Sequence, residues 1–157
     1  MVIAAAFLLL WLGSSLFALR YGGCPERWIA LLLFVAFPAS ILVRKLNWAF
    51  GHIDLGLVLI DGSLLCGLVA VALRADRFWP MPIASMQILA MVGHALKLIE
   101  PDTLPLIYWL TNVVWAYPMQ TLLALGTERH RARERRSGLE PCWSKSSAAT
   151  AAVSQKV

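Results

Sequence analysis

Long apolar runs constrain the fold of this chain more than any other feature. The run Leu55–Leu73 contains a single charged residue, Asp61. A helix in a soluble protein shows polar side chains on one face, at every third or fourth position, whereas this run has no such stripe. Crossing a hydrocarbon core of about 30 Å takes roughly 20 helical residues. The run therefore predicts a helix in contact with lipid.

The composition extends this interpretation to most of the chain. Of the 157 residues, 59% are hydrophobic and 15% are charged, whereas a soluble domain carries about 25% charged residues. The mean hydropathy is +0.68. Too few polar residues are left to cover a soluble domain. We therefore expect an all-α fold, a polytopic membrane helix bundle.

The apolar segments predict about five transmembrane helices within a bundle that spans residues 1–126. They lie at about 2–19, 28–43, 55–73, 81–96 and 104–125. The second and fourth are shorter than the roughly 20 residues of a full crossing. A cleaved signal peptide carries positive charge before its apolar run. None precedes the first segment, so a retained helix is expected there, with a cleaved signal as the alternative.

The distribution of Lys and Arg predicts the orientation, because loops rich in these residues stay in the cytoplasm. Eleven lie on one side, against three on the other: Arg20, Arg27, Arg74, Arg77, Arg129, Arg131, Arg133, Arg135, Arg136, Lys145 and Lys156, against Arg44, Lys45 and Lys97. The N-terminus is thus expected outside and the C-terminus inside. Without the residues after 126, the count falls to four against three.

Residues 127–157 read as a cytoplasmic tail, basic at first and then Ala/Ser-rich and disordered. Its arginines are expected to anchor the chain at the membrane surface: Arg129, Arg131, Arg133, Arg135 and Arg136. Each is worth about 1 kcal/mol near anionic lipid. A helix continuing from the fifth segment is an alternative for the basic part. Nucleic acid is a disfavoured partner, because no aromatic residues alternate with these arginines to stack on bases.

Polar residues inside the apolar segments mark the candidate site, since an ionisable group in a membrane is costly. Asp54 and Asp61 are seven residues apart, as are Gln87 and His94, so each pair shares a helix face. Pairing the two helices places Asp61 opposite Gln87 and Asp54 opposite His94. With the fifth segment, they predict a polar pocket that opens outward, lined by Asp54, Asp61, Gln87, His94, Tyr108 and Asn112.

Two interpretations of this polar face stay open. Histidine titrates near neutral pH, so Asp61 and His94 could pass protons; alternatively, the face is a network of hydrogen bonds that holds the helices together. A haem bound between His52 and His94 is disfavoured, because His52 lies outside the apolar span. No nucleophile arrangement or phosphate-binding glycine loop is visible. The spacing of Cys24, Cys66 and Cys142 indicates neither a disulfide framework nor a metal site.

Three stretches of the chain carry a resemblance: IDLGLVLID at Ile53–Asp61, LRADRFWP at Leu73–Pro80 and YPMQTLLALGTERHR at Tyr117–Arg131. In these stretches the chain resembles a family of small, uncharacterised multi-pass inner-membrane proteins of Gram-negative bacteria. The resemblance covers about residues 15–137. It implies a location in the bacterial inner membrane, and it implies no activity.

Two classes of function fit this sequence. The first is a non-enzymatic accessory, scaffold or assembly component, which would contact another membrane protein or a second copy through the glycines of the third segment and the basic tail. The second is a small proton-linked transporter or sensor that uses the pocket around Asp61 and His94. Neither class requires a cofactor or metal. The lipid bilayer is the one partner common to both.

Overall fold

The computed structural model describes residues 2–50, 55–75, 77–99 and 105–137, with side chains for 5–45, 55–75, 77–96 and 114–136. Within these ranges the protein is all-α. Its five helices are α1 (Val2–Tyr21), α2 (Cys24–Phe50), α3 (Leu55–Arg74), α4 (Pro80–Ile99) and α5 (Pro105–Ser137). Each of the five expected segments corresponds to one of these helices. Helices α1, α3 and α4 have 20 residues each, which is a length of about 30 Å.

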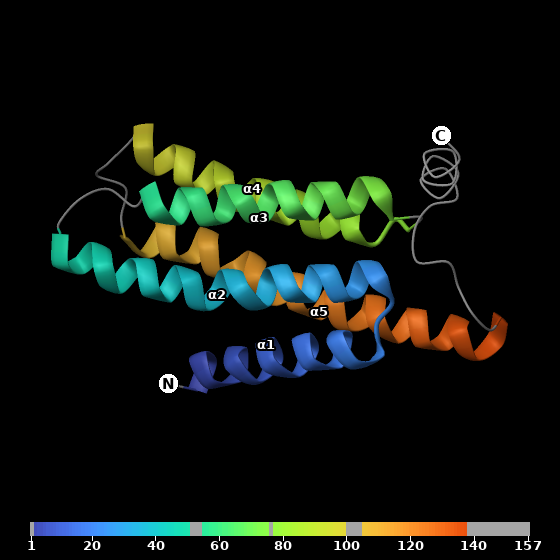
Figure 1. Cartoon of the computed structure of the whole chain (residues 1–157). Helices are drawn as coiled ribbons and strands as arrows, with labels where there is room; N and C mark the ends of the chain where they lie inside the picture. The colour runs from blue at the N-terminus through green and yellow to red at the C-terminus, as the bar shows by residue number, and fades with distance from the viewer. Residues whose placement is uncertain (1, 51–54, 76, 100–104, 138–157) are drawn as a thin grey trace, which may run out of the picture.

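The helices lie side by side and alternate in direction, so that the chain forms one up-and-down bundle (Figure 1). Each packs against its neighbours in sequence, and α5 returns to pack against α1, which closes the ring. Short connections force consecutive helices to be antiparallel neighbours. The α1–α2 turn, the α3–α4 connection and the C-terminal part of α5 consequently share one end of the bundle, called the basic end below.

The packed core fills the half of the bundle nearer the basic end. Its fully buried members include Ala18, Ile29, Leu68, Ile83 and Leu123, one from each helix. Burying an aliphatic side chain of this size stabilises a fold by about 1.5–3 kcal/mol in water, and in lipid close packing takes over this role. The other half of the bundle contains the pocket described below.

Two helices are longer than the sequence predicted. Helix α2 has 27 residues, so the predicted segment 28–43 was too short. Helix α5 has 33 residues and continues through the basic part of the predicted tail, in agreement with the alternative of a helix that extends from the fifth segment. Ala, Glu and Arg favour helix, and Glu128 pairs with Arg131 at 3.6 Å across one turn. The rest of that tail lies outside the described residues.

Two glycines allow the close approaches at the basic end. A Cβ atom on Gly22 would lie 2.4 Å from the carbonyl oxygen of Ala18 and 2.6 Å from Cβ of Glu26. The short α1–α2 turn therefore has no room for a larger residue. On α5, a Cβ atom on Gly126 would lie 2.8 Å from the indole of Trp79. Small residues bring helices together in this way in membrane bundles.

Two helical stretches of the described chain are long and apolar enough to cross a membrane, Cys24–Lys45 and Leu55–Arg74. Ala5–Tyr21 and Pro80–Leu96 are apolar but shorter. Of the cysteines, Cys66 is a free, exposed thiol. Cys24 is disulfide-bonded, which the cysteine spacing did not indicate.

Candidate functional site

A pocket of about 440 Å³ opens in the half of the bundle away from the basic end. Helices α1 to α5 all contribute to its wall. Its volume falls within the range of small-molecule sites, about 300–1,000 Å³. Three of the polar residues singled out in the sequence line it: Asp61, Gln87 and His94. We call this cavity the bundle pocket.

Asp61 and His94 form a direct contact across α3 and α4. The Oδ2 atom of Asp61 lies 2.7 Å from Nε2 of His94. The imidazole is 4% exposed and the carboxyl 21% exposed. A carboxylate and an imidazole at this distance share a proton or form an ion pair, and either arrangement is stronger at a site from which water is largely excluded.

Gln87 contacts the same aspartate from the other side. Its Nε2 atom donates to the backbone oxygen of Asp61 at 3.3 Å. In a helix, side chains lean toward the N-terminus while carbonyl groups point toward the C-terminus. Because α4 runs antiparallel to α3, the Asp61 carboxyl meets His94 and its carbonyl meets Gln87, two turns apart on α4.

This geometry adds a contact that the predicted pairing did not include, because His94 contacts Asp61. The predicted pairing of His94 with Asp54 lies outside the described residues. The α3–α4 connection favours the contact between Asp61 and His94. In two antiparallel helices, residues equally far from the middle of the connection lie opposite one another, and Asp61 and His94 meet this condition approximately. Asp54 and the side chains of Tyr108 and Asn112 lie outside the described residues. Of the six predicted pocket residues, Asp61, Gln87 and His94 are therefore the ones with described side chains.

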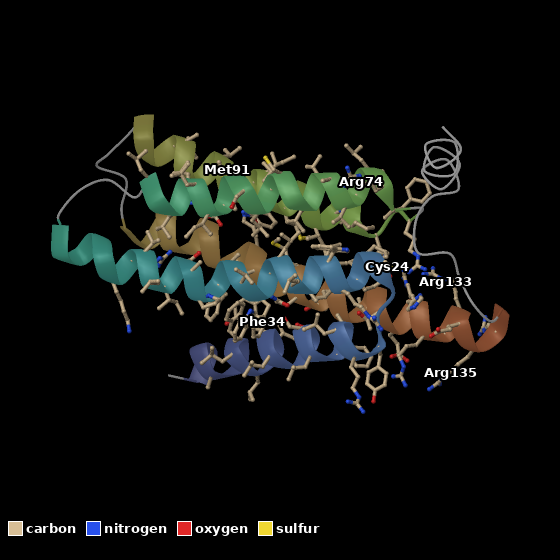
Figure 2. The ribbon with its side chains drawn as sticks, viewed as in Figure 1. Cys24, Phe34, Arg74, Met91, Arg133 and Arg135 are labelled. Carbon is tan, nitrogen blue, oxygen red and sulfur yellow. The ribbon has the colours of Figure 1, made fainter. Side chains whose placement is uncertain are left out.

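The opposite wall of the bundle pocket is aromatic. The ring centroids of Phe7 and Phe37 are 5.2 Å apart, and those of Phe7 and Tyr117 are 5.1 Å apart. Trp11 stacks on Phe34 at 4.7 Å and lies 4.9 Å from Phe37. Figure 2 shows Phe34 between α1 and α2. Aromatic pairs in such arrangements contribute about 0.5–1.5 kcal/mol beyond their buried area, so these ring contacts stabilise the wall.

Sequence reasoning missed this aromatic wall and a buried polar contact beside it. Ser14 Oγ donates to Oε1 of Gln120 at 2.6 Å, and both side chains are buried. The signal was present in the spacing, because Phe7 and Trp11 are four residues apart and Phe34 and Phe37 are three apart. Residues at these spacings share a helix face. Which faces meet across the bundle was not readable from one sequence.

A second polar cluster lies at the basic end. The carboxyl of Glu26, with 0% exposure, pairs with Arg77, which is 12% exposed. Nη2 of Arg77 also lies 3.2 Å from Nδ1 of His130. These residues come from the first turn of α2, the α3–α4 connection and the C-terminal part of α5. A buried charge must be paired, so this cluster links three segments.

The predicted surface anchor residues lie on the C-terminal part of α5. Arg129, Arg135 and Arg136 are exposed, whereas Arg131 and Arg133 are partly buried. Figure 2 shows Arg133 and Arg135 at the same end as Cys24 and Arg74. Most of the cationic side chains that the structure describes therefore lie at this end, whereas Arg44 and Lys45 lie near the opposite end of α2.

No group of three or more potential metal ligands occurs among the described residues. The disfavoured haem alternative involves His52, which lies outside the described residues. For His94, the nitrogen that faces α3 is engaged with Asp61.

Comparisons with known proteins gave no match. No family model, curated protein or solved structure is significantly similar to this chain. The candidate site is consequently interpreted from its own geometry.

Proposed function

We propose that this chain is a multi-pass protein of the bacterial inner membrane that binds a small, largely apolar molecule in the bundle pocket, as a proton-linked transporter or sensor does. The observation that carries the proposal is the Asp61–His94 pair, which lines a cavity with an aromatic opposite wall.

The outer surface of the bundle supports its placement in a membrane. Large apolar side chains are exposed on several helices; examples are Leu9 on α1, Leu42 on α2, Leu59 on α3 and Leu96 on α4, each more than half exposed. Apolar surface this extensive is unusual on soluble monomers. Since α2 and α3 are long and apolar enough to span, their antiparallel neighbours in the same bundle would lie at the same depth.

The lining of the bundle pocket indicates the ligand class. Phe7, Trp11 and Tyr117 present aromatic surface, while Asp61 supplies a carboxyl group. Aromatic rings and a carboxylate together favour an organic cation with apolar substituents. Arg44 also lines the pocket but is exposed, so its charge is screened by solvent. A cation beside Asp61 would compete with the imidazole of His94 for the Asp61 carboxyl group, and this competition would link cation binding to the proton between the two groups.

Tetraphenylphosphonium is a suitable probe, because it is an aromatic cation. We expect the purified protein in neutral detergent to bind it, and Asp61→Asn to weaken binding about tenfold through loss of the carboxylate charge. Glu128→Gln is the matched control, since Glu128 is an exposed carboxylate on α5 outside the pocket lining. Its affinity should stay within twofold of the parent protein.

Proton coupling is tested with the same variants in vesicles loaded with a pH-sensitive dye. The parent protein and Glu128→Gln should show a probe-dependent proton flux, and Asp61→Asn should show none. Equal probe affinity in all three proteins, or a flux that survives Asp61→Asn, would overturn the proposal.

The accessory or scaffold role stays a prediction from the sequence, and one observation bears on it. A Cβ atom on Gly56 would meet Val43 at 2.6 Å, and one on Gly67 would meet Leu32 at 2.9 Å. Two of the three α3 glycines are thus already packed against α2 of the same chain. Purification in mild detergent distinguishes the two roles: a stoichiometric partner supports the accessory role, and a homo-oligomer alone supports the pocket.

A further inference from the structure

A second cavity lies at the basic end, between the C-terminus of α1, the start of α2 and the C-terminal part of α5. Its volume is about 250 Å³. Four arginines line it, together with His130 and one acidic residue, Glu134: Arg20, Arg27, Arg131 and Arg135. Four guanidinium groups against one carboxylate give this cavity, called the arginine pocket below, an excess of positive charge.

Two of these guanidinium groups are held in place by neighbouring groups. Nε of Arg27 donates to the carbonyl oxygen of Gly22 at 2.9 Å. The guanidinium carbon of Arg131 lies 4.5 Å from the ring centroid of Tyr21 and 5.5 Å from that of Phe17. Groups fixed before a ligand arrives lose less conformational entropy when it binds. The planar fork of arginine also matches the oxygens of a phosphate group.

The surface of α1 next to the arginine pocket indicates where the phosphate comes from. Leu9, Leu12 and Leu16 are 74%, 40% and 60% exposed. The spacing of these leucines places them on one helix face with Arg20, which is four residues after Leu16. An apolar stripe therefore leads along α1 to a lining residue of the pocket. A molecule with acyl chains and an anionic headgroup matches both parts.

We propose that the arginine pocket binds the phosphate headgroup of an anionic phospholipid whose acyl chains lie along the Leu9–Leu16 face of α1. The proposal rests on the membrane placement in the proposed function and is independent of the bundle pocket. The arginines that line this pocket would then form a binding site for one lipid molecule, in addition to any diffuse attraction between basic residues and the membrane surface.

Native mass spectrometry of the detergent-solubilised protein measures this binding directly. The probes are short-chain phosphatidylglycerol, the zwitterionic phosphatidylcholine of equal chain length, and inorganic phosphate. We expect one phosphatidylglycerol per chain to be retained, at least about tenfold more than phosphatidylcholine. Inorganic phosphate should displace it only in large excess, because phosphate has no acyl chains to contact α1.

A matched pair of double variants locates the site. Arg20→Gln with Arg135→Gln removes two exposed lining charges, and about 1 kcal/mol per arginine predicts a loss of lipid binding of tenfold or more. Arg129→Gln with Arg136→Gln removes the same charge from exposed positions of α5 that do not line the pocket. Its lipid binding should stay within twofold. Circular dichroism checks the helix content of both, and Arg135→Gln alone replaces the first variant if its folding is impaired.

Three results would overturn the proposal. Equal losses in the two double variants would show diffuse attraction, and equal retention of the two lipids would show no anion recognition. Displacement by phosphate at concentrations similar to those of the lipid would assign the pocket to a free anion. Failure of the proposed function is separately visible, because the Arg20→Gln, Arg135→Gln protein should bind tetraphenylphosphonium like its parent.

Discussion

At the scale of single residues, Asp61 is the residue of the candidate site that contacts both of the other polar side chains, Gln87 and His94. Its carboxyl contacts His94, and its carbonyl contacts Gln87. The sequence predicted that Asp61, Gln87 and His94 would lie near one another, because seven-residue spacing and a short connection constrain two antiparallel helices. It could not fix which atom meets which, since a shift of a few residues between helices changes every partner and leaves the apolar pattern unchanged.

Substitutions at Asp61 should separate charge from hydrogen bonding. Asp61→Ala removes the contact between Asp61 and the imidazole of His94, which is 4% exposed, and removing one partner of a buried hydrogen bond costs about 1–3 kcal/mol. Asp61→Asn keeps an acceptor oxygen and should cost less than half as much. Unfolding in mixed detergent micelles measures both. Equal losses of stability would show that the charge, and not the hydrogen bond, holds the pair.

At the scale of helices, close contacts at glycine fix how α5 meets the α3–α4 connection. Five helices and their approximate positions followed from apolar runs, because lipid requires about 20 helical residues per crossing. The ends of α2 and α5 could not be predicted from the apolar runs. Polar residues beyond an apolar run can either continue the helix or end it, so the run does not mark where the helix stops. The packing of Trp79 on Gly126 is a tertiary contact with no local signal.

Adding one methyl group at two glycines should have opposite effects on stability. Gly126→Ala puts a Cβ atom 2.8 Å from the Trp79 indole, and overpacking of this kind costs about 1–3 kcal/mol. Gly62→Ala meets nothing within 4 Å and should stabilise α3 by up to about 1 kcal/mol, as alanine does in a helix. Thermal unfolding in detergent compares the two. A Gly126→Ala protein as stable as its parent would show that Trp79 moves aside freely.

The Glu26–Arg77 pair should behave as a buried ion pair that joins α2 to the α3–α4 connection. Arg77→Met leaves the Glu26 carboxylate, with 0% exposure, without this partner, and breaking such a pair costs about 3–5 kcal/mol. Changing Glu26→Gln as well removes the stranded charge and should recover at least half of the loss. Equilibrium unfolding of the parent, single and double variants measures the recovery. No recovery in the double variant would contradict the pairing.

At the scale of the whole molecule, the alternation of the five described helices places the bundle pocket toward one end of the bundle and the arginine pocket toward the other. The charge pattern predicted that most Lys and Arg side chains gather at one end. The two cavities themselves could not be predicted, since each is formed by side chains from helices far apart in the sequence. Their proposed roles depend on whether α4 and α5 cross the membrane together with α2 and α3.

The sidedness of the α4–α5 connection tests this directly. In a cysteine-free background, single cysteines are introduced as Asp102→Cys and Phe78→Cys, and intact cells with a permeabilised outer membrane are treated with a membrane-impermeant maleimide. If all five helices span, Asp102→Cys is labelled from outside, and Phe78→Cys is labelled only after the inner membrane is opened. If only α2 and α3 span, the two positions lie on the same side and are labelled together, which would contradict the five-helix membrane bundle.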